Sequence, residues 1–403
     1  MDNLEFTRET NRKIFETIEW LREMKVDWVT VAMPYLVSVI KQIAPEIKVS
    51  LSTFSYVDTL QKAIQFEKMG VDEITLPEGL NRNFPLLKTL RRHLSCTLQL
   101  IATNVCMAAC AYRTTHTNSQ SHASQEGHVS NGVVFDYCML KCTEMSIKDP
   151  VEIIKMPWIR PEDTEHYENI GLENFKITER MKRTDLLIEI AQAYTDRRYD
   201  GPLDNLLNFR IKSNFLPPNS TIMENTVAYK KEYLLESREL LFSRRVQIDN
   251  NRLDGFLDHF IRQEKDCRNI LCGVECRHCH QVAAKVLNYD ERENEMLLMR
   301  YKELLKAVSS GALHDQEEAP LEWPEEVSRM LNFFLEKKPE FIRNSARAST
   351  TLRAEKYARE RKSERVEMPD LVKANFEETP REFRAMLLDE MKRMGIEMEE
   401  LIS

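Results

Sequence analysis

The chain begins with an amphipathic pattern and then alternates short apolar runs with helical periodicity. Ile14, Ile18 and Leu21 recur at helical spacing, which predicts a helix over residues 8–24. Strand-like runs follow, and their onsets are about 21–24 residues apart, with helical segments between them. This alternation predicts βα units on a parallel sheet, and therefore an α/β fold.

Four clear strands and three further helices are expected before residue 105. The strands are predicted at Trp28–Ala32, Lys48–Ser52, Asp72–Leu76 and Thr97–Thr103, and the helices at Tyr35–Gln42, Tyr56–Lys68 and Leu86–Leu94. Two weaker strands are predicted at Glu152–Met156 and Asn174–Ile177. Eight such units close a TIM barrel, so the sequence predicts a partial, TIM-barrel-like domain.

The remaining segments predict a division into three parts. Residues 111–136 are polar and non-periodic and are expected to form a long loop. Linkers are expected at 208–225 and 311–320. We therefore predict an α/β barrel-like domain over 1–210, a helical cysteine-rich segment over 211–310 and a small all-α domain over 321–403.

The composition excludes several classes of protein. Of 403 residues, 42% are hydrophobic and the net charge is −8, which fits a packed core and argues against a general nucleic-acid coat protein. No apolar run approaches the roughly 20 residues of a membrane span. The opening MDNLEFTRET lacks the apolar region of a signal peptide, so we expect a cytoplasmic location.

Eight of the nine cysteines fall into two groups of four, and clustered thiols in a cytoplasmic chain indicate metal or redox chemistry. The first cysteine group is Cys106, Cys110, Cys138 and Cys142. It consists of two CxxxC pairs, the first directly after a predicted strand, where barrel chemistry is found. Four thiolates suit a [4Fe–4S] cluster or tetrahedral zinc, and the alternative is buried cysteines or a zinc staple for the loop.

The second cysteine group is Cys267, Cys272, Cys276 and Cys279. His278 and His280 lie beside it and are possible substitute ligands. The spacing is compatible with a second [4Fe–4S] cluster that passes electrons to the first, or with a structural zinc site.

Three further residues are candidates for catalysis or anion binding. Arg113 supplies a fork for a carboxylate, and His116 can transfer protons near neutral pH. Arg160 is a second anion anchor, with Lys176 and Arg180 adding positive charge. The alternatives are solvated loop histidines (His116, His122 and His128) and, after Arg160, a helix start at Pro161 whose acidic first turn needs no function.

Several segments together resemble the U32 peptidase family. They are Cys106–Asn118, Trp158–Asp163, Tyr167–Gly171, Phe175–Lys182 and, more loosely, Val49–Thr53 and Leu76–Leu80. The resemblance covers residues 8–210 and continues to about residue 290. It implies a TIM-barrel-like domain and a [4Fe–4S] cluster held by four cysteines. Some members are called collagenase-like proteases. Others hydroxylate tRNA or rRNA bases or a quinone precursor without oxygen, with prephenate as the oxygen donor.

The sequence departs from the family pattern in two places. The usual amino-terminal strand–helix units are not found, so we expect the barrel to start at about its third unit, and either it stays open or a partner covers the exposed sheet edge. Glu179 stands where the FKIxGR stretch of the family has glycine.

The carboxyl-terminal segment has a second resemblance. Trp323, Glu326, Pro339, Phe341 and Arg343, followed by Glu355, Ala358 and Arg359, are similar to the small helical domain that ends the light-independent protochlorophyllide reductase B subunit. This implies a docking module, and the basic run over 343–365 is otherwise a solvated helical face.

The sequence therefore predicts an iron–sulfur enzyme that hydroxylates or otherwise modifies an organic or RNA-base substrate without oxygen. One alternative is a non-catalytic scaffold or electron-transfer partner of a second U32 protein. The other is a peptidase, although the sequence contains no HExxH or GxSxG motif.

Overall fold

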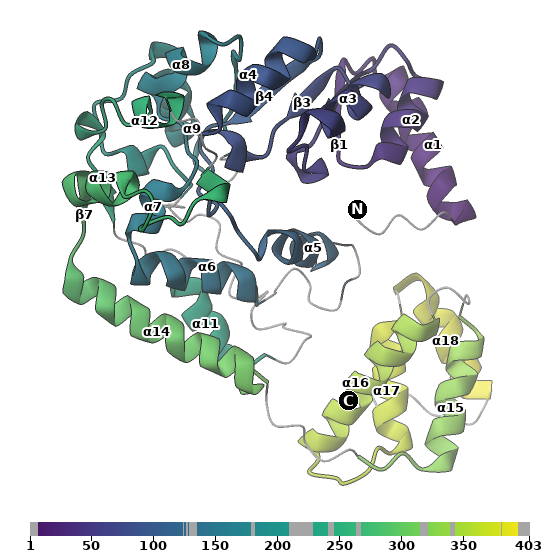
Figure 1. Cartoon of the computed structure of the whole chain (residues 1–403). Coiled ribbons are helices and arrows are strands. Elements are labelled where there is room, and N and C mark those ends of the chain that lie inside the picture. Colours follow the sequence, from purple (N-terminus) through teal and green to yellow (C-terminus); the bar gives the residue numbers. More distant parts are fainter. Residues whose placement is uncertain are drawn as a thin grey trace. The chain divides into compact units, whose positions relative to one another are not determined.

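The computed structural model describes residues 7–123, 125, 128, 135–178, 182–208, 229–240, 246–262, 267–314, 321–338, 343–379 and 381–393. The chain divides into two compact units, residues 1–315 and 316–403. The first combines a parallel sheet with many helices, and the second is built from helices (Figure 1).

The first unit contains a parallel sheet of five strands in the order β1-β2-β3-β4-β5. The strands are β1 (Trp28–Val31), β2 (Lys48–Leu51), β3 (Glu73–Thr75), β4 (Thr97–Ile101) and β5 (Asn174–Lys176). Val29 pairs with Val49, Ile74 with Leu98, and Leu100 with Phe175. All strands point the same way, so their carboxyl ends share one edge of the sheet.

The helices before and between the strands bury the apolar positions that the sequence pattern indicated. They are α1 (Arg8–Glu23), α2 (Pro34–Ile43), α3 (Leu60–Lys68) and α4 (Phe84–His93), with short 3₁₀ turns η1 (Thr53–Ser55) and η2 (Glu78–Leu80) after β2 and β3. Figure 1 shows α1 to α4 beside the strands. Val49, Leu51, Ile74 and Leu100 are fully buried, as expected where helices cover a parallel sheet.

Four of the predicted strands and the weaker one at Asn174 are confirmed, and two predictions are wrong. The strand expected at Glu152–Met156 is helix α7 (Val151–Lys155), because Pro150 supplies the N-cap position and the run Val-Glu-Ile-Ile-Lys fits either period. The loop expected over 111–136 contains helix α5 (Arg113–Ala123). Barrel-like closure of the sheet stays a prediction.

Further helices complete the first unit, beginning with α6 (Tyr137–Lys148), which carries one cysteine pair. The others are α8 (Thr164–Glu168), α9 (Thr184–Asp196), α11 (Lys231–Leu240), α12 (Asp258–Arg262), α13 (His278–Val286) and α14 (Glu291–Ser310). Short 3₁₀ turns are η3 (Pro161–Asp163), η4 (Leu203–Asn205), η5 (Asn250–Arg252) and η6 (Cys267–Asn269). Strands β6 (Gln247–Ile248) and β7 (Leu287–Asn288) form a small antiparallel pair.

The second unit has its own apolar core, formed by α15 (Glu325–Glu336), α16 (Arg343–Glu360), α17 (Met368–Glu378) and α18 (Arg381–Arg393). Basic residues of its predicted basic run are paired with acids: Arg353 with Glu377 and Glu378, and Arg361 with Asp370. Pairing of this kind favours the solvated-face interpretation of that run.

Within the described ranges, none of the helices combines the length and the apolarity that crossing a bilayer would require.

Candidate functional site

The first CxxxC pair lies in the loop that follows β4, at the carboxyl edge of the sheet. Gly79 of η2 permits this loop to approach closely, since a Cβ at position 79 would lie 3.1 Å from the carbonyl oxygen of Ala108. Cys106 and Cys110 are both partly buried, and the Cys106 thiol lies 3.7 Å from Asn104 Oδ1. Backbone packing against η2 therefore fixes where these two thiols lie.

The second pair, Cys138 and Cys142, lies one helical turn apart on α6. Burial raises the pKa of Cys106, and among the neighbouring charges that raise it further is that of Cys142. Burial also raises the pKa of Cys138, and the charges of Asp136 and Cys110 raise it further. The two predicted cysteine pairs are thus within electrostatic range of each other. All nine cysteines lie in described segments and none forms a disulfide.

A buried ion pair lies between the cysteine loop and η2. Glu78, which follows β3, is fully buried and accepts hydrogen bonds from Arg113 Nη2 at 2.6 Å and from Asn104 Nδ2 at 3.0 Å. The Arg113 guanidinium also lies 5.2 Å from the ring centroid of Tyr56. Glu78, Asn104 and Tyr56 are site residues that the sequence analysis missed. The signal available was their position, since each follows a strand of the same parallel sheet.

Two buried donors of this site have no hydrogen-bond partner among the described residues: the Tyr56 hydroxyl and Arg113 Nε. Tyr56 ends η1 with φ +48, a left-handed conformation that a tyrosine seldom adopts. Strain of this kind and unpaired buried donors both cost free energy, and they occur together mainly at functional sites.

His116 forms a dyad with Asp136. The His116 Nδ1 atom lies 2.7 Å from Asp136 Oδ2, and Asp136 Oδ1 accepts the Met139 N–H at the start of α6. Burial alone would raise the pKa of Asp136, but the hydrogen bonds from His116 and Met139 hold it below its ordinary value. With Nδ1–H donating to the carboxylate, Nε2 remains as the basic atom, an arrangement suited to proton transfer.

Aromatic rings surround these groups. Tyr112 and Tyr137 meet edge to face with centroids 6.3 Å apart, each next in sequence to a site residue, Arg113 or Cys138. Tyr137 and Phe54, which precedes Tyr56 by two residues, are both exposed. Exposed rings of this kind offer stacking surfaces for a planar ligand.

The second cysteine group lies between α12 and α13. A short parallel bridge pairs Cys272 with Cys276, around Gly273 at φ +87. The Cys276 Sγ atom lies 3.5 Å from His259 Nε2. Burial raises the pKa of Cys279 to about 11, and the charges of the other three thiols of the group contribute to the increase. The four thiols of this second predicted group are therefore within electrostatic range of one another.

In the present side-chain arrangement, no three His, Cys, Asp or Glu residues of the described segments are positioned to hold a metal ion. Binding of a metal by four thiols at either cysteine group stays a prediction.

The sequence model of peptidase family U32 matches residues 3–208. The chain belongs to this family. It is 31% identical over 267 residues to an uncharacterized protease of Methanocaldococcus jannaschii, an alignment that covers 66% of this chain and 68% of that protein. A solved structure of the U32 peptidase Mk0906 is 32% identical, covers 24% of this chain and 39% of that chain, and has a TM-score of 0.23.

The Arg160 guanidinium of this U32 protein already lies within ion-pair distance of two carboxylates. It is buried, with Nε 2.8 Å from Asp163 Oδ2 and Nη2 2.9 Å from Asp254 Oδ1, and it donates to the Asn250 carbonyl. Its role as an anion anchor stays a prediction, because a ligand would first have to displace the exposed Asp254. Arg180, proposed as a neighbouring cation, lies outside the described residues.

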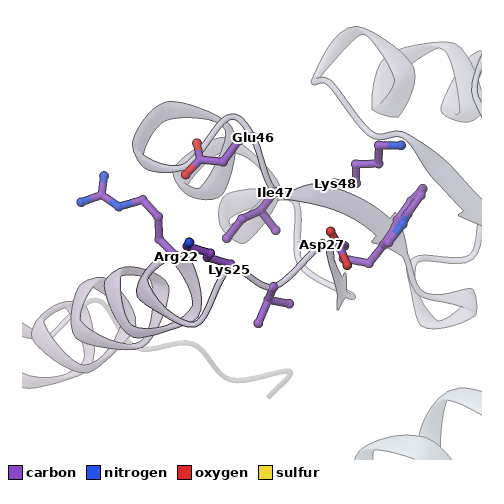
Figure 2. A pocket seen from close by; sticks show the side chains of 8 residues that line it. Arg22, Lys25, Asp27, Glu46, Ile47 and Lys48 are labelled. Carbon is purple, nitrogen blue, oxygen red and sulfur yellow. The ribbon is translucent and has the colours of Figure 1, made fainter.

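A pocket at the opposite end of the sheet is separate from the U32 site. It is lined by charged residues at the start of β1 and β2, among them Lys25, Asp27, Glu46 and Lys48 (Figure 2). Because barrel-type chemistry occurs at the carboxyl ends of the strands, this pocket at the amino ends is not part of the candidate site.

The dyad leads to a prediction about pH dependence. We expect Asp136→Ala to lower the free energy of unfolding by about 1 kcal/mol, because α6 loses its N-cap. We expect Asp136→Asn to keep the cap but to remove the charge of the carboxylate. Because the pKa of Asp136 is lowered in the folded state, its charge stabilises the wild type above the ordinary pKa of an aspartate, and this stabilisation disappears as the pH falls through the lowered pKa. Asp136→Asn should lack this pH-dependent stabilisation. Urea titrations between pH 3 and pH 7 would measure the free energy of unfolding of both variants. If the stability of wild type and Asp136→Asn fell identically toward acidic pH, the lowered pKa of Asp136 would be contradicted.

Proposed function

We propose that this U32 protein is an iron–sulfur enzyme that hydroxylates or similarly modifies a planar organic or RNA-base substrate without molecular oxygen. The observation that supports the proposal is that Cys106 lies beside the buried Glu78–Arg113 pair at the carboxyl edge of the sheet, with Cys142 within electrostatic range of it, while the adjoining α5 and α6 carry the His116–Asp136 dyad. Thiol donors, a cation and a proton carrier are the groups that such chemistry needs in one place.

The four cysteines are of the right chemical type for a [4Fe–4S] cluster, since thiolates are the usual ligands of such clusters. Cys106 and Cys110 on the loop and Cys138 and Cys142 on α6 would hold it. Once bound, the cluster would supply electron transfer.

The protein's own residues would bind and orient the substrate. The exposed rings of Phe54 and Tyr137 would stack on a planar ring. Arg113 Nε and the Tyr56 hydroxyl, both unpaired among the described residues, could donate to a carboxylate oxygen donor such as prephenate. Glu78 holds Arg113 in place, and His116 Nε2 could accept or return a proton.

The same geometry argues against a cysteine peptidase at this site. A nucleophilic cysteine needs a lowered pKa, whereas burial and the neighbouring Glu78 charge raise the pKa of Cys106. The thiol form therefore dominates at neutral pH in the absence of a metal.

We expect anaerobically purified protein to contain iron and acid-labile sulfide, and the double variant Cys138→Ser, Cys142→Ser to lose about one cluster per chain. Cys96→Ser is the matched control, because Cys96 is a buried cysteine outside both groups. Iron and sulfide analysis with visible absorption would measure this. Wild-type protein with neither iron nor sulfide would end the proposal, and cleavage of gelatin that survives Cys106→Ala would favour the peptidase.

A further inference from the structure

A buried arginine from a distant part of the chain lies beside the second cysteine group. Arg82 follows η2 and donates to the carbonyl oxygens of Ile154 and Met156 at the end of α7. Its guanidinium lies 4.7 to 5.1 Å from the ring centroids of three aromatic residues, Phe256, Trp158 and Phe260. Neither α4 nor the sheet requires a cation at this position.

Arg82 lacks a carboxylate partner in the described part of the chain. Its Nε atom is buried with no hydrogen-bond partner there. The Phe256 ring that this guanidinium contacts also stacks on His278, with centroids 5.5 Å apart, and His278 directly precedes Cys279. Burial lowers the pKa of Arg82, and the charges that oppose this effect are those of Cys279, Tyr167, Cys267 and Asp163. A buried cation without an ion-pair partner is costly, and thiolates bound to a metal at the second cysteine group would supply negative charge near it.

A second cation lies near the same group. Lys155 of α7, which is paired with Glu152 at 2.7 Å, lies within electrostatic range of Cys272. Two cations from different elements thus flank four thiols that lie within thirteen residues. Cations near thiols favour the thiolate form, which is the form that binds metal.

We propose that Cys267, Cys272, Cys276 and Cys279 bind a metal centre as thiolates, and that Arg82 is the buried cation that balances its negative charge. Gly273 permits the tight turn between Cys272 and Cys276, and His259 fixes the Cys276 side chain from outside the group. Either a [4Fe–4S] cluster or a zinc ion has this four-thiolate chemistry. The proposal does not depend on the function of the first cysteine group.

A purely structural role for Arg82 is the competing explanation. An arginine that bonds the last carbonyls of α7 and packs on aromatic rings stabilises a helix end without any metal. The two explanations differ in whether the loss of Arg82 changes metal binding.

The first experiment isolates the second group. The full chain carrying Cys138→Ser and Cys142→Ser, purified anaerobically, should retain about one metal centre per chain, seen as iron with sulfide or as zinc alone. Adding Cys272→Ser and Cys276→Ser should remove it, while adding Cys96→Ser should not. A first-group variant that holds neither metal, or metal that persists without Cys272 and Cys276, overturns the proposal.

The second experiment tests Arg82 in the same first-group background. Arg82→Gln should speed metal loss to a chelator by roughly 10- to 100-fold, the usual effect of removing an outer-sphere partner. Arg82→Lys, which keeps the charge but not the fork, should lose metal at an intermediate rate. If both variants unfold at lower urea concentration yet retain metal like the parent, Arg82 is a helix cap only. If Arg82→Gln does not fold, the Arg82→Lys rate decides.

Discussion

Glu78→Ala is expected to lower the free energy of unfolding of the first unit by about 3 kcal/mol. The substitution removes the carboxylate that pairs with Arg113 and leaves that guanidinium mostly buried without a counter-charge, which costs more than the pair itself contributes. Urea titration followed by circular dichroism would measure the loss, with two transitions fitted because the chain has two compact units. A loss below about 1 kcal/mol, typical of an exposed pair, would contradict the prediction.

A double-mutant cycle separates charge from packing at this pair. Arg113→Met should also be destabilising, because it leaves Glu78 buried and unpaired. With Glu78→Gln as the other single variant, the double variant Glu78→Gln, Arg113→Met should be more stable than the sum of the two single losses implies, since no buried charge remains. The Glu78 variants should also lower the pKa of Cys106, because the neighbouring Glu78 charge adds to the effect of burial in raising it. Alkylation rates of metal-free protein across pH would detect that change.

Arg160→Met is expected to destabilise the first unit by roughly 3–5 kcal/mol, because the Arg160 and Asp163 side chains are both only 4% exposed. Burial raises the pKa of Asp163 although Arg160 opposes that increase. Without Arg160 this pKa should rise further. A carboxyl with a raised folded-state pKa favours folding as pH falls, so the deficit should shrink toward acidic pH. Urea midpoints at pH 5 and pH 7.5 would show this.

Asp254→Asn is the matched control for Arg160, because the Asp254 side chain is 83% exposed and its pairing should contribute no more than about 1 kcal/mol. If Arg160→Met lowered the free energy of unfolding no more than Asp254→Asn does, Arg160 would not be needed for the stability of the fold. The anion-anchor prediction would then gain support.

The sequence was sufficient for the sheet but not for all of its surroundings. Strand spacing identified β1 to β4 because short runs that contain β-branched and other apolar residues alternate regularly with helical segments. Helix α5 was missed because its residues, Arg113 to Ala123, are almost all polar and carry no apolar stripe. The Asp before Tyr137 was an N-cap signal for α6 that could have been used.

The chemistry was only partly predictable for a different reason. Arg113 and His116 were chosen by residue type and by their distance from Cys110. Their partners Glu78 and Asp136 lie up to 35 residues away, and no local period connects them. Such pairs follow only once the strands are known to be parallel and adjacent. Tyr56 gives no sequence signal at all, because its left-handed conformation is a property of the folded turn.

The turn after β3 joins the surroundings of both cysteine groups. Glu78 contacts the first site, Arg82 lies beside the second, and between them the buried Asn81 donates to the carbonyl oxygens of Ile101 and Pro157. Five consecutive residues are therefore constrained from two directions at once. A substitution of Asn81 during evolution would therefore disturb the surroundings of both cysteine groups. Loss of only one cysteine group during evolution would require changes outside this turn.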